Sequence, residues 1–153
     1  MMLEIKIEPP IQALVRELEQ LKEGLGEKGI RAGLVYGAKP LKDTMKSLAP
    51  YDRGALSRAV GHVSPSARAK SRLGIKRDTA AILVGANRKV AAGGEGRKIW
   101  QGRKAHWHEQ GTKHMGATPF MSTAFQASAH QIEGRFYQGL TRYLERQRAK
   151  HSS

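Results

Sequence analysis

The chain has 153 residues, which suits a single domain with a modest core and is too short for two independent cores. It contains no cysteine, which excludes disulfides, a thiolate nucleophile and a cysteine zinc site, and no apolar stretch approaches the roughly 20 residues of a membrane helix. The formal net charge of +14 favours an acidic partner, and residues 1–10 lack the apolar middle of a secretion signal, which predicts a cytoplasmic origin.

Helical periodicity dominates the first third of the chain, where we expect helical segments over 11–49. Apolar residues recur at helical spacing over 11–23, and a second periodic stretch runs from Ile30 to Pro50. Pro40 lies inside this second stretch and lacks the amide hydrogen that a helix interior needs. The sequence therefore predicts a kinked helix that ends at Pro50.

Strands are expected over 54–85. The stretch 55–63 shifts toward an alternating pattern of apolar residues. The best strand candidates are 72–76 and 79–85, which a turn at 77–78 separates. Together they predict an antiparallel hairpin.

The segment 86–104 is rich in Gly, Lys and Arg and shows no period, so we expect a long mobile loop. Across 62–104 the chain holds eleven Lys and Arg against two Asp and Glu. Such a positive segment attracts nucleic acid, an acidic protein surface or a membrane, although a solvated loop that only aids solubility is the simpler interpretation. The run 93–98 resembles a phosphate-binding loop, but it lacks the spacing and the following Ser or Thr.

The clearest helix is predicted over 118–148, with 149–153 as a basic tail. Thr118 suits the N-cap and Pro119 the first helical position. Apolar residues follow an i, i+4 series from Phe120 onward, so the apolar stripe wraps slowly round the helix. The fold class expected is α+β, with a small antiparallel β-sheet packed against a kinked N-terminal helix and a long C-terminal helix.

Metal and catalytic sites are not predicted. His106, His108 and His114 fall within nine residues, and an H-x-H pair on a strand would point both rings to one face, as zinc or nickel needs. No partner carboxylate or cysteine completes a convincing set, and Trp107 is expected to anchor the packing there. The sequence also lacks a recognisable nucleophile with its base or a carboxylate pair, so we expect no enzyme and no cofactor.

Three short segments, taken in order, carry a family resemblance. They are 48–56 (LAPYDRGAL), 106–112 (HWHEQGT) and 117–125 (ATPFMSTAF). Their ordered combination resembles the tail-component family of long-tailed bacteriophages, the small neck or tail-completion proteins. In that family a helix ends in an A-P-x-x-T-G-x-L turn, a hairpin follows, and an aromatic-x-x-E-x-G-T segment leads to x-x-P-F-x-x-x-A at the start of a terminal helix. Arg53 stands where the family usually has threonine, and the basic loop 88–104 is longer than usual.

The resemblance implies a structural virion protein at the head-tail junction, assembled in the host cytoplasm. Its partners would be copies of itself in a six-fold ring, the adjacent neck, tail-terminator or tail-tube proteins, and non-specific DNA in the channel. No membrane is implied, and both head-side and tail-side placement remain open. The alternative function is a non-specific nucleic-acid-binding protein that uses the basic segment 62–104.

The motif residues have expected structural roles. Gly54 and Gly111 lie at element boundaries, where a tight or left-handed backbone needs glycine. Glu109 is expected to bond backbone amides at the positive start of the terminal helix or to pair with a neighbouring Arg. Phe120 is expected to be the buried plug that seats this helix on the sheet. The full set of motif residues is Pro50, Gly54, Leu56, Glu109, Gly111, Thr112, Pro119 and Phe120.

Contacts with other subunits, neighbouring proteins or DNA are expected at two places, the basic loop and the exposed far end of the terminal helix. Because DNA passes through the rings of this family, the loop faces either DNA or the acidic rim of an adjoining ring. The candidates are Arg88, Lys89, Arg97, Lys98, Arg103 and Lys104 in the loop, with Tyr137, Arg142, Tyr143 and Arg146 in the helix.

Overall fold

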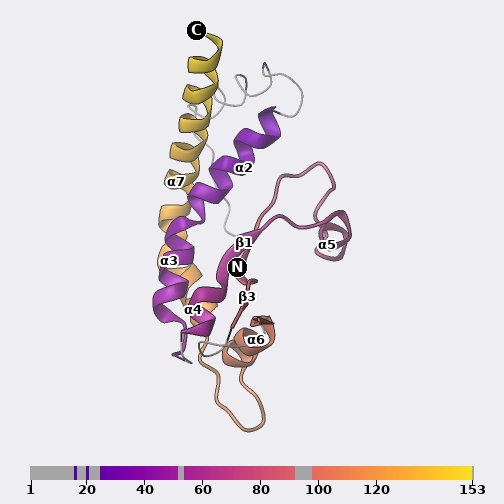
Figure 1. Ribbon diagram of the computed structural model, residues 1–153, viewed down its shortest axis with the longest axis vertical. Helices are drawn as coiled ribbons and strands as arrows, with labels where there is room; N and C mark the ends of the chain where they lie inside the picture. The colour runs from indigo at the N-terminus through magenta and orange to yellow at the C-terminus, as the bar shows by residue number, and fades with distance from the viewer. Residues whose placement is uncertain (1–15, 17–19, 21–24, 52–53, 92–97, 153) are drawn as a thin grey trace.

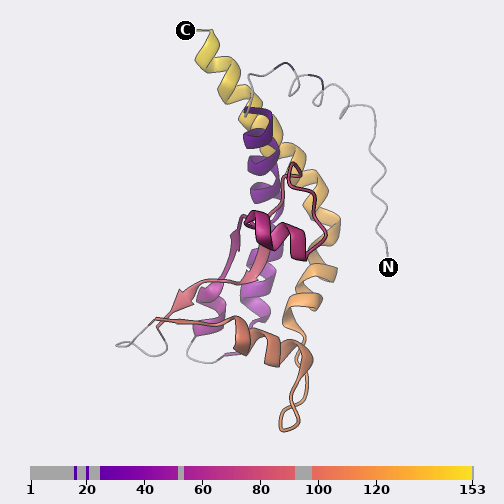
Figure 2. The same cartoon turned by 90° about the vertical axis from the view of Figure 1, so that its right-hand side faces the viewer.

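The computed structural model describes residues 16, 20, 25–51, 54–91 and 98–152. Figure 1 shows an elongated molecule in which one long helix, α7, runs beside a bent pair of helices, α2 and α3. The shorter elements lie to one side of this helical layer (Figures 1 and 2). In chain order the elements are α2 (Leu25–Gly37), α3 (Lys39–Leu48), α4 (Ala55–Ala59), β1 (Val60–Val63), α5 (Ala67–Arg72), β2 (Leu83–Ala86), β3 (Lys89–Val90), β4 (Ile99–Trp100), α6 (Gly102–Gln110) and α7 (Phe120–His151).

The helical layer formed by α2 and α3 bends at Ala38. The backbone stays hydrogen-bonded across the bend, since Ala38 N donates to Leu34 O and Lys42 N donates to Ala38 O, both at 2.9 Å. Pro40 occupies the first turn of α3, where its missing amide hydrogen costs no helical hydrogen bond. The predicted kinked helix is therefore confirmed. The helix predicted over 11–23 lies largely outside the described residues.

Within the described residues, the paired strands form two short antiparallel ribbons. In the first, β1 pairs with β2, with Val60 opposite Ala86 and Val63 opposite Leu83. In the second, β3 pairs with β4, with Lys89 opposite Trp100. The predicted fold class, a small antiparallel sheet with a bent helix and a long terminal helix, is confirmed.

The predicted hairpin of 72–76 with 79–85 is wrong, because the first of these segments ends α5 and turns. The side chain of Ser66 accepts a hydrogen bond from Ala69 N at 3.2 Å, which caps α5 and favours helix over strand. Lys70 Nζ then donates to two carbonyls beyond the helix, Arg77 O at 2.8 Å and Thr79 O at 2.7 Å. These bonds hold the connection in a turn, so β2 finds its partner in β1.

The stretch 55–63 is also only partly a strand. Its first half forms the short helix α4, and its second half forms β1. An alternating pattern over so few residues does not distinguish a turn of helix from a strand when most of the side chains are buried.

Residues 86–104 are not a single loop, which corrects the sequence prediction. β3 (Lys89–Val90) pairs with β4 (Ile99–Trp100) within this segment, and α6 begins at Gly102. Strands of two residues each are too short to produce a visible period. The glycine-rich run 92–97, on which the prediction of mobility chiefly depends, lies outside the described residues.

The predicted terminal helix is confirmed as α7, and its apolar stripe is buried along its length. The predicted tail 149–153 is wrong, because α7 continues to His151. Ser128 interrupts the stripe, but its hydroxyl donates to Ala124 O at 2.7 Å, so this buried polar group is satisfied within the helix. The buried members of the stripe are Phe120, Ala124, Ser128, Leu140 and Leu144.

The core has two parts that α7 connects. The smaller part joins α7 to α2, where Ile30 packs against Leu140 and Leu144. The larger part joins α3 and α7 to the short elements α4, β1, β2 and α6. It contains Leu41, Met45, Leu56, Ala59, Val60, Ala86, Ala105, Phe120 and Ala124.

Glycines allow α2 and α7 to cross closely in the smaller part of the core. A Cβ atom on Gly139 would lie 2.5 Å from Cβ of Tyr36 and 3.1 Å from Cα of Gly33. A Cβ atom on Gly33 would lie 2.9 Å from the ring of Phe136. Side chains at either glycine would therefore push the two helices apart.

Candidate functional site

The first candidate region is the joint between α6 and α7, which Glu109 makes. One carboxylate oxygen accepts a hydrogen bond from Met121 N at 2.9 Å, and the other accepts one from Ser122 N at 2.9 Å. Both amides belong to the first turn of α7, where helical donors have no partner within the helix and the dipole favours a negative charge. Of the two roles expected for Glu109, the structure shows the bonding of backbone amides.

The predicted cap of α7 by Thr118 is wrong. The helix begins at Phe120, one residue later than expected, and Pro119 takes the capping position without a side-chain hydrogen bond. The Thr118 hydroxyl lies 3.3 Å from His108 Nδ1 instead, and Thr118 N donates to His108 O at 2.6 Å. Glu109 therefore does the capping from another helix. Phe120 is buried in the core, as predicted.

A tight turn follows α6, and Gly111 makes it possible. Gly111 has φ 76°, and a Cβ atom there would lie 2.9 Å from Ala117 N and from Met115 O. Thr112 N then donates to Met115 O at 2.8 Å, which closes the turn. The predicted role of Gly111 at a helix boundary is confirmed.

The turn between α3 and α4 uses the remaining motif residues. Ala49 is extended, as expected before Pro50, and α3 ends at Leu48 as predicted. Gly54 has φ 69° and stands at the start of α4, so a left-handed backbone is again assigned to glycine. Leu56 is fully buried behind it. Arg53 lies outside the described residues.

Each of the three motif segments also exposes one large aromatic residue. Tyr51 is 91% exposed, Trp107 is 44% exposed and Phe125 is 45% exposed. Trp107 was expected to anchor the packing, and nearly half of its surface is exposed. The elements that carry the second and third segments, α6 and the start of α7, lie at the same end of the molecule (Figure 1).

The histidines do not form the arrangement that a metal site needs. His106 and His108 lie on α6, not on a strand, so about 200° of helical rotation separates their side chains. Within the described ranges, no group of three His, Asp or Glu side chains could hold a metal ion.

The basic residues of 62–104 do not form one surface. Those of α5 lie apart from those of the second ribbon and α6 (Figure 2). Lys104 is half-buried and engaged in an interaction, and Arg97 lies outside the described residues. The exposed candidates of the predicted loop are Arg88, Lys89, Lys98 and Arg103.

The far end of α7 is less exposed than the sequence analysis expected. Tyr143 packs against the smaller part of the core. Tyr137 meets the ring of Phe136 edge-on at 5.2 Å, and burial, with a smaller effect from Glu133, raises its pKa. Arg142 lies in the open, although its guanidinium stacks 4.9 Å from the centre of the Tyr36 ring. Arg146 is exposed, as predicted.

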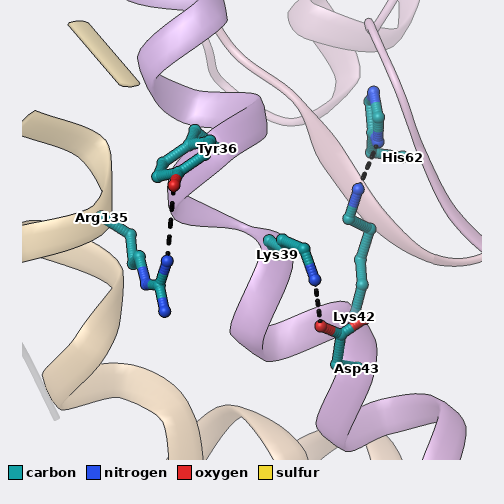
Figure 3. A network of polar contacts seen from close by, with 6 residues as sticks. All are labelled: Tyr36, Lys39, Lys42, Asp43, His62 and Arg135. Atoms are coloured by element: carbon teal, nitrogen blue, oxygen red, sulfur yellow. Dashed lines mark hydrogen bonds and ion pairs between the residues drawn. The ribbon is translucent and has the colours of Figure 1, made fainter. Parts of the chain in front are cut away.

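A polar network on α2 and α3 was missed by the sequence analysis. Figure 3 shows Lys42 Nζ directed at His62 Nδ1, 3.0 Å away, and Lys39 Nζ bonded to Asp43 Oδ2 at 2.7 Å. Burial and several nearby cations lower the pKa of Lys42. The sequence does contain basic residues at helical spacing in this region, but the net charge of the whole segment does not show on which helix face they lie.

The chain has no match among protein-family models, curated proteins or solved structures.

The arrangement therefore has to be interpreted from its own residues. Glu109, the one acid of the three motif segments that the structure describes, is occupied by two backbone amides. No helix within the described ranges has the length and apolar character needed to cross a bilayer.

Proposed function

We propose that this chain is a non-enzymatic structural subunit of a tailed-phage virion, which forms a six-fold ring at the head-tail junction as a neck or tail-completion protein. The observation that carries the proposal is the two-sided use of the motif segments. Each segment places residues inside the molecule that hold the fold together. Each also places one large aromatic residue on the surface.

The inward residues make the joints of the domain. Leu56 and Phe120 fill the larger part of the core, and Glu109 joins α6 to α7. These roles are those of a scaffold, because each residue is already satisfied by a partner within the chain. A reactive group would need a free position to meet a substrate.

The exposed aromatic residues supply the contact surface of the proposal. Tyr51, Trp107 and Phe125 retain much of their apolar area in water, and exposed large apolar groups of this kind mark interaction sites. In a ring, each subunit presents this surface to a different surface on the next subunit. Burial of the three aromatic side chains would then stabilise ring closure.

The order of elements also supports the proposal. A bent helix, a turn with a left-handed glycine, an antiparallel pair and a terminal helix follow one another. The family resemblance implies a helix, a turn, a hairpin and a terminal helix in that order, and here the antiparallel pair of β1 with β2 spans α5 in place of the hairpin. The exposed basic residues of the second ribbon and α6, Arg88, Lys89, Lys98 and Arg103, would face channel DNA or the acidic rim of an adjoining ring.

Mass measurement tests the proposal. Light scattering of the purified chain, alone and mixed with the products of its neighbouring genes, should give a closed assembly of six times 16.9 kDa. The variants Trp107→Glu and Phe125→Glu should release subunits from that assembly. Their matched controls are His106→Glu and Gln126→Glu, which place the same charge at an exposed neighbouring position on the same helix.

A single 16.9 kDa species under all of these conditions would contradict the proposal. Equal effects of the aromatic variants and their controls would contradict the assignment of the contact surface.

A further inference from the structure

A row of basic side chains follows one face of α2 and α3. Relative to Lys28, the members lie 3, 11, 14 and 18 residues further along the chain, and Val35 lies 7 residues along. With Val35 included, the successive steps are three or four residues, which place all of them on one side of a helix, within the limits set by the bend. Four members, with Ala32, Val35 and Tyr36 between them, line an open depression of about 470 Å³. The row consists of Lys28, Arg31, Lys39, Lys42 and Lys46, and we call it the α2–α3 stripe.

Neighbouring elements add positive charge to the α2–α3 stripe. Arg88 follows β2 and lies close enough to lower the pKa of both Lys42 and His62. On the other side, Arg135 and Arg142 of α7 approach the ring of Tyr36, at 5.8 Å and 4.9 Å from its centre. The face therefore carries cations from three separate parts of the chain.

The described part of α2 and α3 carries the five cations of the stripe against two acids, Glu27 and Asp43. Asp43 pairs with Lys39 at 2.7 Å, but both side chains are more than half exposed, and such surface pairs are weak. Repulsion between the remaining like charges raises the free energy of the unoccupied face. A bound polyanion would relieve that repulsion.

The shape of the face favours a linear polyanion. A helix rises 1.5 Å per residue, so cations three or four residues apart are separated by about 5 Å along the axis, and Arg31 and Lys39, which are eight residues apart, by about 12 Å. Lys28 and Lys46 are therefore about 27 Å apart along a straight helix, and somewhat less across the bend. One free phosphate cannot contact such a row, whereas a nucleic-acid strand presents a phosphate at every nucleotide.

The apolar residues of the face argue against a membrane as the partner. An interfacial helix buries bulky apolar side chains in the lipid. Here the residues between the cations are small or covered: Ala32, Val35 and Tyr36, whose ring lies beneath two guanidinium groups.

We propose that the α2–α3 stripe binds the phosphate backbone of nucleic acid without sequence preference. Apart from Arg88 at its edge, this surface is distinct from the basic segment 62–104, and binding there does not require ring formation. Five phosphate contacts would make the logarithm of the binding constant fall with the logarithm of salt concentration with a slope of about −4.5.

Fluorescence anisotropy with two duplex oligonucleotides of unrelated sequence tests the proposal. Both should bind equally well, with the salt slope given above. The double variant Arg31→Glu with Lys46→Glu should weaken binding by on the order of 10- to 100-fold at low salt and reduce the slope by about 2. The matched control, Arg68→Glu with Arg72→Glu on α5, changes the net charge equally at exposed positions and should keep the wild-type slope.

Several results would overturn the proposal. They are no binding to either duplex, binding to anionic vesicles or polyglutamate in place of DNA, or an equal loss of slope in the control. Circular dichroism checks the fold of each variant, and Arg31→Gln with Lys46→Gln provides a milder pair that should also lower the slope. Light scattering on the same samples measures ring formation separately. Loss of oligomerisation can therefore be distinguished from loss of nucleic-acid binding.

Discussion

The carboxylate of Glu109 on α6 caps α7 by accepting the backbone amide of Met121 at 2.9 Å. Its second oxygen accepts the neighbouring amide of Ser122, so both oxygens are used. Caps of this kind are usually supplied by the residue just before the helix, but Pro119 occupies that position and offers no side-chain acceptor. This side chain, together with the hydrogen bonds between Thr118 and His108, joins α6 to the start of α7.

Removing the Glu109 carboxylate should destabilise the fold. The variant Glu109→Ala leaves two amides of the first turn without their acceptor and removes a negative charge from the positive end of α7. We expect the free energy of unfolding to fall by about 1–2 kcal/mol, measured by urea denaturation. The control Gln110→Ala changes an exposed neighbour on the same helix and should stay within about 0.5 kcal/mol of wild type. Equal losses in the two variants would show that the cap is unimportant.

Two glycines of α7 should respond in opposite directions to alanine. Gly139→Ala would place a Cβ atom 2.5 Å from Cβ of Tyr36, so α2 and α7 must separate, and we expect a loss of about 1–3 kcal/mol. Gly134→Ala meets nothing within 4 Å, so alanine's better helix propensity should stabilise the fold by up to about 1 kcal/mol. Thermal unfolding of both variants checks the pair. A stabilised Gly139→Ala would contradict the close crossing of the helices.

The parts of the fold that could be predicted are those with long repeats. The stripe of α7 extends from Phe120 to Leu144, which is enough turns for a helical period to be unmistakable. Pro40 likewise predicts the bend, because a proline lacks the amide hydrogen and clashes with the preceding helical turn in any surroundings. Strand pairing is different, since β1 and β2 have four residues each and 19 residues separate them. The small cap at Ser66 decided that region in favour of a helix.

The candidate sites follow the same rule. The role of Glu109 could be predicted because a carboxylate near a helix start has few uses other than bonding amides. The sequence could not predict that Glu109, and not Thr118, caps α7, because this depends on how α6 lies against α7. The α2–α3 stripe could not be found from the net charge of its segment, because residues 1–61 are nearly neutral in sum. The positive charge becomes apparent when the residues are arranged by helix face.

Protonation of His62 should link stability to pH. Burial lowers its pKa most, and Lys42, Arg88 and Arg31 lower it further. The unfolded chain therefore binds this proton at a higher pH than the folded chain does. As pH falls through the ordinary histidine value of about 6.5, the unfolded state gains protons first and the free energy of unfolding decreases. Above that pH the contribution of His62 to stability is complete.

Nuclear magnetic resonance titration and urea denaturation check this link. The His62 ring should titrate below the ordinary value, and Lys42→Met should raise its pKa only in part, because burial remains. His62→Gln should flatten the corresponding part of the dependence of stability on pH. A His62 imidazole whose pKa lies at or above the ordinary histidine value would contradict the effect of burial and nearby cations.

Charge reversal distinguishes a specific contact made by the basic residues of the second ribbon and α6 from a general effect of net charge on assembly of the proposed ring. If the ribbon and α6 contact DNA or an adjoining ring, four substitutions to Glu there should abolish incorporation of the chain into virions, because attraction becomes repulsion. A complementation assay that counts infectious particles measures this effect. Four exposed basic residues on α5 and its following turn provide a control with the same change in net charge, and that control should assemble. Assembly that survives the ribbon variant would show the contact assignment to be wrong, and failure of both would implicate net charge. The ribbon variant changes Arg88, Lys89, Lys98 and Arg103, and the control changes Arg68, Arg72, Lys76 and Arg77.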